Sequence, residues 1–179
     1  MANSNNSLNK FDNLLTNSDK LNFRIICEAY IFDDNNRIFA QKRSSNRLKH
    51  PNSWNVVGGH LESGESLSEC ICREVWEETG WEILVIVDLL EIIEFDLPIE
   101  MLENGEKSSE KVFKFLVKVK ELKEPILESE KVSEYRWFDK QNAEITTQNR
   151  TEKQGINYVM NGIIKAVDYL EKTGKKINF

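Results

Sequence analysis

The chain lacks a long apolar run and lacks a basic, signal-like start. Its first twenty residues are rich in Asn and Ser, and they contain neither an apolar core nor a small-residue cleavage motif. No stretch is apolar over enough residues to cross a bilayer. These absences argue against a secretory signal and a membrane span, so we expect a cytoplasmic protein without a membrane partner.

Positive charge and the usual zinc ligands are also scarce. The 179 residues include 24 Lys and Arg against 30 Asp and Glu, which gives a formal net charge of −6 and a pI near 5.2. Such a chain offers no broad basic surface for a nucleic acid duplex. Cys70 and Cys72, with the isolated His50 and His60, supply too few well-spaced ligands for a zinc site, and Cys27 makes the number of cysteines odd. We expect free thiols in a reducing compartment.

The chain does have enough apolar sequence for one folded domain. Hydrophobic residues make up 40% and charged residues 30% of it, which at this length supports a single core. We expect the domain to span residues 21–179, preceded by a tail at 1–20. The tail carries four apolar residues at helical spacing, namely Leu8, Phe11, Leu14 and Leu15. This spacing is compatible with a short helix that docks on the domain or on a second subunit in a homodimer.

The pattern of strands and helices indicates an α/β protein. Strands are expected at 23–32, 37–43, 54–57, 82–95, 111–120 and 134–138. The first two should form a hairpin through the turn residues 33–36. Alternation in 111–120 predicts one buried face, with lysines on the other. Helices are expected at 66–79 and from about 156 to 172, so we predict a mixed sheet covered by helices on both faces.

The first of these helices carries an unusual concentration of carboxylates. It has no interior Gly or Pro and stops at Gly80, and its geometry puts Glu74, Glu77 and Glu78 on one face. Like charges at this spacing destabilise a helix by about 0.2–0.5 kcal/mol per pair. A divalent cation would reverse the effect, because Mg²⁺ takes oxygen ligands from carboxylates. The pattern therefore predicts metal ligands on this face.

This stretch resembles the Nudix box. From Gly58 to Trp81 it reads GGHLESGESLSECICREVWEETGW. The matching positions are Gly59, Glu65, Arg73, Glu74, the aliphatic Val75, Glu77, Glu78 and Gly80. Trp81 differs, because the family usually has an aliphatic residue there. The resemblance implies a Nudix hydrolase with an α/β/α sandwich, in which a mixed β-sheet lies between helices.

The resemblance also implies roles for individual residues. The expected metal ligands are Gly58, through its carbonyl group, with Glu74, Glu77 and Glu78, and the expected ion is Mg²⁺ or Mn²⁺. Glu74 and Glu77 are the catalytic candidates, and Glu74 is either a ligand or the general base.

Other residues are expected to support these ligands or to contact the substrate. Arg73 would hold the box glutamates in place, and Glu65 would be its partner or a further ligand. The expected substrate contacts are Arg43, His50, Gly59 and Glu130. Four aromatic residues could stack on a nucleobase or belong to the core, namely Trp54, Tyr135, Trp137 and Phe138.

The expected reaction is metal-dependent hydrolysis of a diphosphate bond in a nucleoside diphosphate linked to a group X. The substrate would be a nucleoside triphosphate or a related small nucleotide. Two alternatives stay open: a non-catalytic Nudix-fold nucleotide-binding or sensor module, and a hydrolase of a non-nucleotide diphosphate. Substrate choice should depend on the loops at 44–53, 96–109 and 122–133, whose sequences do not rank the candidates.

Overall fold

The structure, a computed structural model, describes residues 8–48, 50–97, 109–148 and 155–174. The chain divides into two compact units. The first unit comprises Met1–Ala29 and Gly58–Pro125, and the second comprises Tyr30–Val57 and Ile126–Phe179. The expected domain boundary at residue 21 stays a prediction.

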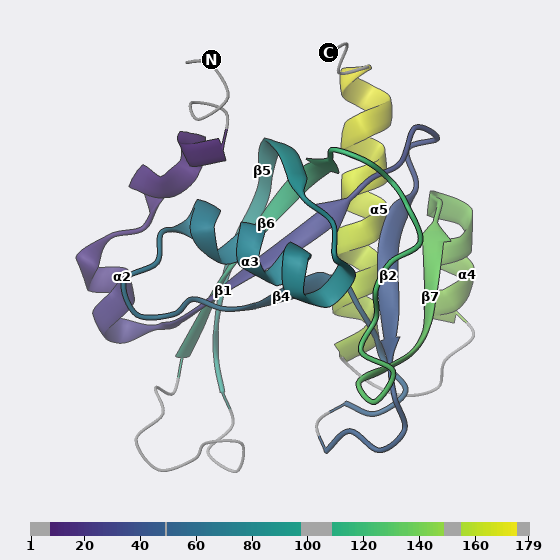
Figure 1. The fold of residues 1–179 in the computed structure, drawn as a ribbon, viewed down its shortest axis with the longest axis horizontal. Coiled ribbons are helices and arrows are strands. Elements are labelled where there is room, and N and C mark those ends of the chain that lie inside the picture. Colours follow the sequence, from purple (N-terminus) through teal and green to yellow (C-terminus); the bar gives the residue numbers. More distant parts are fainter. Residues whose placement is uncertain (1–7, 49, 98–108, 149–154, 175–179) are drawn as a thin grey trace. The chain divides into compact units, whose positions relative to one another are not determined.

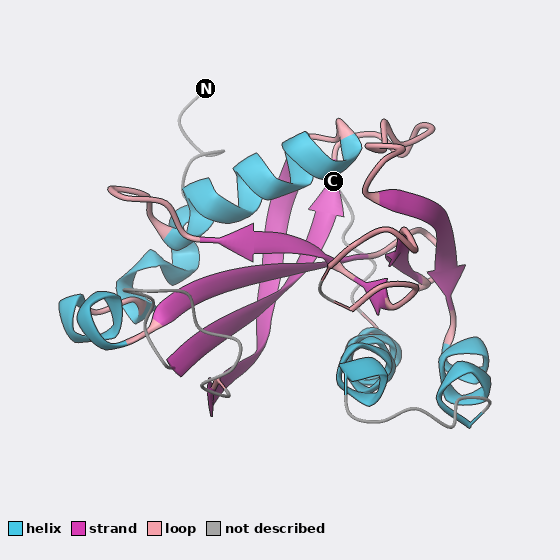
Figure 2. Ribbon diagram, turned by 90° about the horizontal axis from the view of Figure 1, so that it is seen from below, coloured by secondary structure: helices cyan, strands magenta, loops and turns pink. Residues whose placement is uncertain are grey.

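The first unit contains a four-stranded sheet with the strand order β4-β1-β6-β5. Its elements are η1 (Asn9–Leu14), α2 (Asn17–Asn22), α3 (Leu67–Thr79), β5 (Ile83–Asp96), β6 (Ser109–Val119) and most of β1 (Arg24–Ile31) and β4 (Val57–His60). The last two residues of β1 and the first residue of β4 are assigned to the second unit. Strands β5 and β6 pair antiparallel along their whole length, and three register shifts make β5 irregular. Helix α3 lies along one face of this sheet (Figures 1 and 2).

The second unit contains a three-stranded antiparallel sheet with the order β3-β2-β7. Its elements are β2 (Ile38–Arg43), β3 (Trp54–Asn55), β7 (Val132–Phe138), α4 (Lys140–Gln148) and α5 (Gly155–Thr173). Helix α5 contacts β2 and β3, α4 contacts β7, and the two helices contact each other. The apolar side of α5 is buried through Val159, Met160, Ile163, Val167 and Leu170. This burial confirms the amphipathic helix predicted at the end of the chain.

The turn after β1 is present, but the predicted hairpin is wrong beyond it. The Asp33 carboxylate accepts hydrogen bonds from the backbone N–H groups of Asn35 at 2.9 Å and Arg37 at 2.8 Å. Phe32 and Ile38 then form an isolated antiparallel bridge. The pairing does not extend beyond this bridge, and β1 and β2 belong to different sheets. The local sequence encodes the reversal, whereas the partners of each strand depend on contacts with distant strands.

Strand β6 also departs from the prediction, because side chains on both of its faces are buried from Val112 to Val117. Lys114, predicted on a solvent face, is only 3% exposed and donates to Glu91 on β5 at 3.1 Å. The facing carboxylate on the paired strand makes burial of this ammonium group tolerable. The α/β class, with sheets flanked by helices, is nevertheless confirmed. Within the described ranges, no helix combines the length and the apolar character that a bilayer crossing requires.

Candidate functional site

Helix α3 has defined caps at both ends, as its sequence predicts. The backbone N–H of Ser66 donates to the Glu69 carboxylate at 2.8 Å, and the Glu69 N–H donates to the Ser66 hydroxyl at 3.3 Å. This reciprocal pair is a capping box. At the other end Gly80 adopts the left-handed conformation with φ 71°, and its N–H donates to the Trp76 carbonyl at 2.8 Å. The acidic face is therefore displayed on a well-delimited helix.

Arg73 links the loop before α3 to the carboxylates on it. Its guanidinium donates to both oxygens of Glu65, with Nε–Oε1 at 2.7 Å and Nη2–Oε2 at 3.0 Å. Its Nη1 donates to Glu74 Oε1 at 2.8 Å and to Glu77 Oε2 at 3.3 Å. Nη2 also donates to the His60 carbonyl at 2.9 Å. The forked guanidinium thus fixes three carboxylates relative to one another.

The same contacts and burial shift the pKa values of Glu65, Arg73 and Glu74 in different directions. Hydrogen bonds from Arg73 lower the pKa of Glu65, although partial burial opposes them. The hydrogen bond to Glu65 is in turn the main cause that raises the pKa of Arg73. Burial raises the pKa of Glu74, and its contact with Arg73 only partly offsets that effect, while the charge of Glu77 adds to it. Glu74 therefore binds a proton more readily than an exposed Glu.

The two glycines before the helix lie against the acidic residues and β1. A Cβ atom on Gly59 would lie 2.3 Å from Glu74 Oε1, so the carboxylate occupies the space of the missing side chain. A Cβ on Gly58 would lie 2.3 Å from the Cys27 carbonyl oxygen. The N–H of Gly58 donates to Glu78 Oε2 at 3.3 Å. Glycine at both positions allows backbone and carboxylates to approach closely.

The candidate ligands have the donor atoms that a divalent cation such as Mg²⁺ prefers. Glu74, Glu77, Glu78 and the Gly58 carbonyl are all oxygen donors, the type that Mg²⁺ and Mn²⁺ prefer. In the part of the chain that the structure describes, no three His, Cys, Asp or Glu side chains are grouped closely enough to hold an ion as they stand. Arg73 binds one oxygen each of Glu74 and Glu77. Since a carboxylate has two oxygens, these hydrogen bonds are compatible with metal ligation.

Three predicted substrate contacts belong to the second unit. Arg43 ends β2, and the next residue, Ser44, donates its N–H to the Lys131 carbonyl at 2.9 Å. This bond joins the loop after β2 to the loop that carries the exposed Glu130. His50 is exposed in a turn with φ 51°. Because the box residues belong to the first unit, the roles of Arg43, His50 and Glu130 stay predictions. Two of the loops expected to select the substrate include residues 49 and 98–108, which lie outside the described residues.

The aromatic candidates fall into two groups. Trp54 and Phe138 are buried and pack edge to face, with ring centroids 5.0 Å apart. Tyr135 and Trp137 are half-buried, and both contact the ring of Phe39, at 5.6 and 5.4 Å. Trp54 and Phe138 are therefore core residues, and the other two combine packing with partial exposure.

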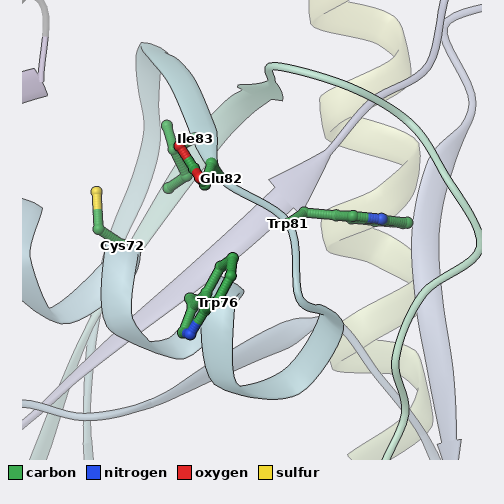
Figure 3. A pocket seen from close by; sticks show the side chains of 5 residues that line it. All are labelled: Cys72, Trp76, Trp81, Glu82 and Ile83. Atoms are coloured by element: carbon green, nitrogen blue, oxygen red, sulfur yellow. The ribbon is translucent and has the colours of Figure 1, made fainter.

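A hollow of about 330 Å³ lies on another side of α3 (Figure 3). Its lining consists of Cys72, Trp76, Trp81, Glu82 and Ile83. Cys72 and Trp76 are four residues apart and share a helix face, which is opposite to that of Glu74. The indole N–H of the buried Trp81 donates to the Lys123 carbonyl at 3.0 Å. This hydrogen bond accommodates the residue that departs from the usual box pattern.

Contacts from the start of the chain reach this site and were missed by sequence reasoning. Asp12 accepts hydrogen bonds from Ser68, and Lys20 donates to the Glu65 carbonyl at 3.2 Å. The His60 carbonyl, a partner of Arg73, was missed as well. Spacing gives no signal for these contacts, because they join residues far apart in the sequence or involve backbone atoms.

Comparison with known proteins identifies the family. The model of the NUDIX domain matches residues 23–158, and the chain therefore belongs to the Nudix family. Nudix hydrolase 19, chloroplastic, of Arabidopsis thaliana is 52% identical over 33 residues, which are 18% of this chain and only 8% of that protein. The chain thus matches a small part of this relative's length.

Solved structures share the fold at low sequence identity. The MutT protein from Methanosarcina mazei Go1 is 22% identical, with 86% of this chain and 96% of that chain covered and a TM-score of 0.58. A UDP-X diphosphatase is 20% identical, with 86% and 64% covered and a TM-score of 0.55. These similarities confirm the predicted Nudix-type fold.

Proposed function

We propose that this chain is a metal-dependent pyrophosphohydrolase that cleaves a diphosphate bond in a nucleoside diphosphate linked to a group X. Nucleoside triphosphates and related small nucleotides are the first candidate substrates. The observation that carries the proposal is the network in which Arg73 binds Glu65, Glu74 and Glu77 beside Gly59. Membership of the Nudix family and the name of the similar UDP-X diphosphatase support it.

The proposed chemistry assigns a task to each part of the network. The proposed metal ligands are Gly58, Glu74, Glu77 and Glu78. A bound Mg²⁺ or Mn²⁺ supplies charge neutralisation at phosphate oxygens and lowers the pKa of a bound water. Glu74, which burial makes more basic, is proposed either to bind the ion or, in place of that role, to accept the proton of the attacking water. Arg73 orients the carboxylates, and Glu65 holds Arg73 in position.

The proposed substrate contacts come from several elements. Gly59 is proposed to contact a phosphate group through its backbone atoms. Arg43, His50 and Glu130 are proposed contacts from the second unit. If Arg43 binds the phosphates, Arg43→Ala should raise KM and leave kcat nearly unchanged, because the lost contact is made in both the ground state and the transition state. An unchanged KM would remove Arg43 from the proposed contacts.

A substrate panel with product identification tests the proposal. The panel contains nucleoside triphosphates, sugar nucleotides, dinucleoside polyphosphates and non-nucleotide diphosphates, each with Mg²⁺ or Mn²⁺. Glu74→Gln and Glu78→Gln should each lower kcat by at least about a hundredfold. Glu171→Gln, which removes one exposed carboxylate from α5, is the matched control and should keep the wild-type rate. Undiminished turnover in both box variants would refute the assignment.

A non-catalytic nucleotide-binding or sensor module is the rival. One observation favours it: hydrogen bonds from Arg73 already hold Glu74 and Glu77 in place without a metal ion. Calorimetry decides between the two. Tight nucleotide binding with no product after long incubation in metal would establish the module. Turnover confined to the non-nucleotide diphosphates would instead establish a hydrolase of that class.

A further inference from the structure

Residues 9–22, here called the N-terminal segment, pack at the beginning of helix α3. They form η1 and α2, and they precede the part of the chain that matches the NUDIX domain, which begins at residue 23. Figure 1 shows these two helices, in purple, beside the end of α3 at which the helix starts. The segment is therefore an addition to the matched domain that reaches the helix carrying the box glutamates.

Asp12 completes the N-terminus of α3. Its Oδ1 accepts from the backbone N–H of Ser68 at 2.8 Å, and its Oδ2 accepts from the Ser68 hydroxyl at 2.8 Å. Ser68 is the second residue of the helix and is buried. Its N–H is one of the first four in the helix, which have no partner within the helix itself. A carboxylate at this end also interacts favourably with the helix dipole.

Lys20 binds the other side of the same junction. Its Nζ donates to the Glu65 carbonyl at 3.2 Å, just before the Ser66 cap. The side chain of Glu65 binds Arg73, and Arg73 binds Glu74. Glu65, through its backbone carbonyl and its side chain, therefore connects the N-terminal segment to Arg73 and the proposed base.

The N-terminal segment is itself fixed to the sheet. The ring of Phe11 packs on the buried Phe115 of β6, with centroids 5.8 Å apart. The Asp19 carboxylate accepts from Lys111 of β6 at 2.7 Å. Thr16 and Asp19 form a capping box that defines the start of α2. Asp12 and Lys20 therefore connect the start of α3 to strand β6. Through these contacts the sheet can fix the position of the first turn of the helix.

We propose that the N-terminal segment positions the catalytic helix, with Asp12 as the positioning residue at its start and Lys20 as a second contact. The inference rests on the proposed function. Catalytic groups are sensitive to placement, since an error of 1 Å can lower a rate by about a hundredfold. A segment that only covered the sheet would need Phe11 and the contact with Lys111, but not the two hydrogen bonds to Ser68.

Two substitutions at Asp12 and two controls test this role. Asp12→Ala removes both acceptors, and Asp12→Asn keeps one, because a side-chain amide oxygen caps a helix as well as a carboxylate does. Val167→Ala creates a cavity beneath α5 in the second unit and controls for a general loss of stability. Glu171→Gln controls for the loss of one negative charge. The measurements are thermal unfolding, hydrogen exchange of the first-turn amides of α3, kcat and KM, and calorimetric Mn²⁺ affinity.

Asp12→Ala should speed exchange at the start of α3 and lower kcat, each by about tenfold, with KM within twofold of wild type. It should also weaken Mn²⁺ binding several-fold. Asp12→Asn should restore most of kcat, and both controls should keep it. A wild-type kcat in Asp12→Ala, or an equal loss in Val167→Ala, would overturn the inference. If the wild type hydrolyses nothing in the panel, the proposed function fails separately. Mn²⁺ affinity then decides: weaker binding in Asp12→Ala supports positioning, and unchanged binding overturns it.

Discussion

Replacing Gly59 with alanine should disable the site while leaving the fold intact. The new Cβ would lie 2.3 Å from Glu74 Oε1 and 2.6 Å from Oε2, whereas ordinary van der Waals contact begins at 3.4 Å. The Glu74 carboxylate must therefore retreat by about 1 Å. Retreat of this size would disturb its hydrogen bond with Arg73, now 2.8 Å long. Gly59 is not among the glycines with positive φ, so the backbone itself accepts alanine.

In Gly59→Ala, the expected loss of rate is much larger than the expected loss of stability. Misplacing a catalytic group by 1 Å lowers a rate by about a hundredfold, equivalent to about 2.7 kcal/mol of transition-state stabilisation. The free energy of unfolding should change by less than about 1 kcal/mol, because the displaced atoms end a side chain that can rotate. Activity and stability should therefore respond very differently to this substitution.

Gly58→Ala is the matched comparison. Its Cβ would lie 2.3 Å from the backbone carbonyl of Cys27 in β1, which cannot retreat by a side-chain rotation. This variant should lose thermal stability as well as activity. The assays are kcat on whichever substrate the panel identifies and thermal unfolding of both variants. A wild-type kcat in Gly59→Ala, or a loss of stability in it equal to that of Gly58→Ala, would refute the reasoning.

Three further predictions address other parts of the chain. Arg73→Lys replaces a forked donor by a single ammonium group, so kcat should fall by about tenfold or more, and an unchanged kcat would contradict its orienting role. The hydrogen bond from Lys111 lowers the pKa of Asp19 from 3.8 to about 2. The ionised carboxylate therefore stabilises the folded state by about 2 kcal/mol above pH 4, and this stabilisation is lost as the pH falls towards 2. Urea unfolding of wild type and Asp19→Asn should therefore converge near pH 2; parallel curves would contradict this. In the second unit, a Cβ on Gly162 would lie 2.1 Å from the Tyr30 hydroxyl oxygen, so Gly162→Ala should destabilise by about 1–3 kcal/mol, and an unchanged melting temperature would contradict the clash.

Local patterns were sufficient to predict helix α3. Its serine cap, its terminal Gly80 and its acidic face all follow from residues within one or two helical turns of each other. The long amphipathic helix α5 was predicted for the same reason. The resemblance to the Nudix box left Glu65 open as a partner of Arg73 or a further ligand, and the structure shows the two side chains bonded at 2.7 and 3.0 Å.

Features that depend on distant residues were not predictable. The alternation in β6 correctly indicated a strand, but only the position of Glu91 on β5 explains why Lys114 is buried. The pKa of Glu74 is raised by burial, which the packing around it creates. The hydrogen bonds of Asp12 to Ser68 span 56 residues of sequence. The periodicity of the sequence does not predict such contacts, because neither partner can be distinguished in the sequence from an ordinary surface residue.

The charge arrangement at the end of α3 has a consequence for the engineering and evolution of this protein. The last turn of the helix contains no basic residue, and Glu77 and Glu78 lie next to the negative end of the helix dipole. Substitution by glutamine removes the charge and keeps an oxygen that can accept from Arg73 or from the Gly58 N–H. Such substitutions should raise the melting temperature and be among the easiest stabilising changes to find. A library selected for heat resistance alone would therefore accumulate the changes that remove the proposed metal ligands. Selection for thermal stability and selection for turnover should drive these two positions in opposite directions.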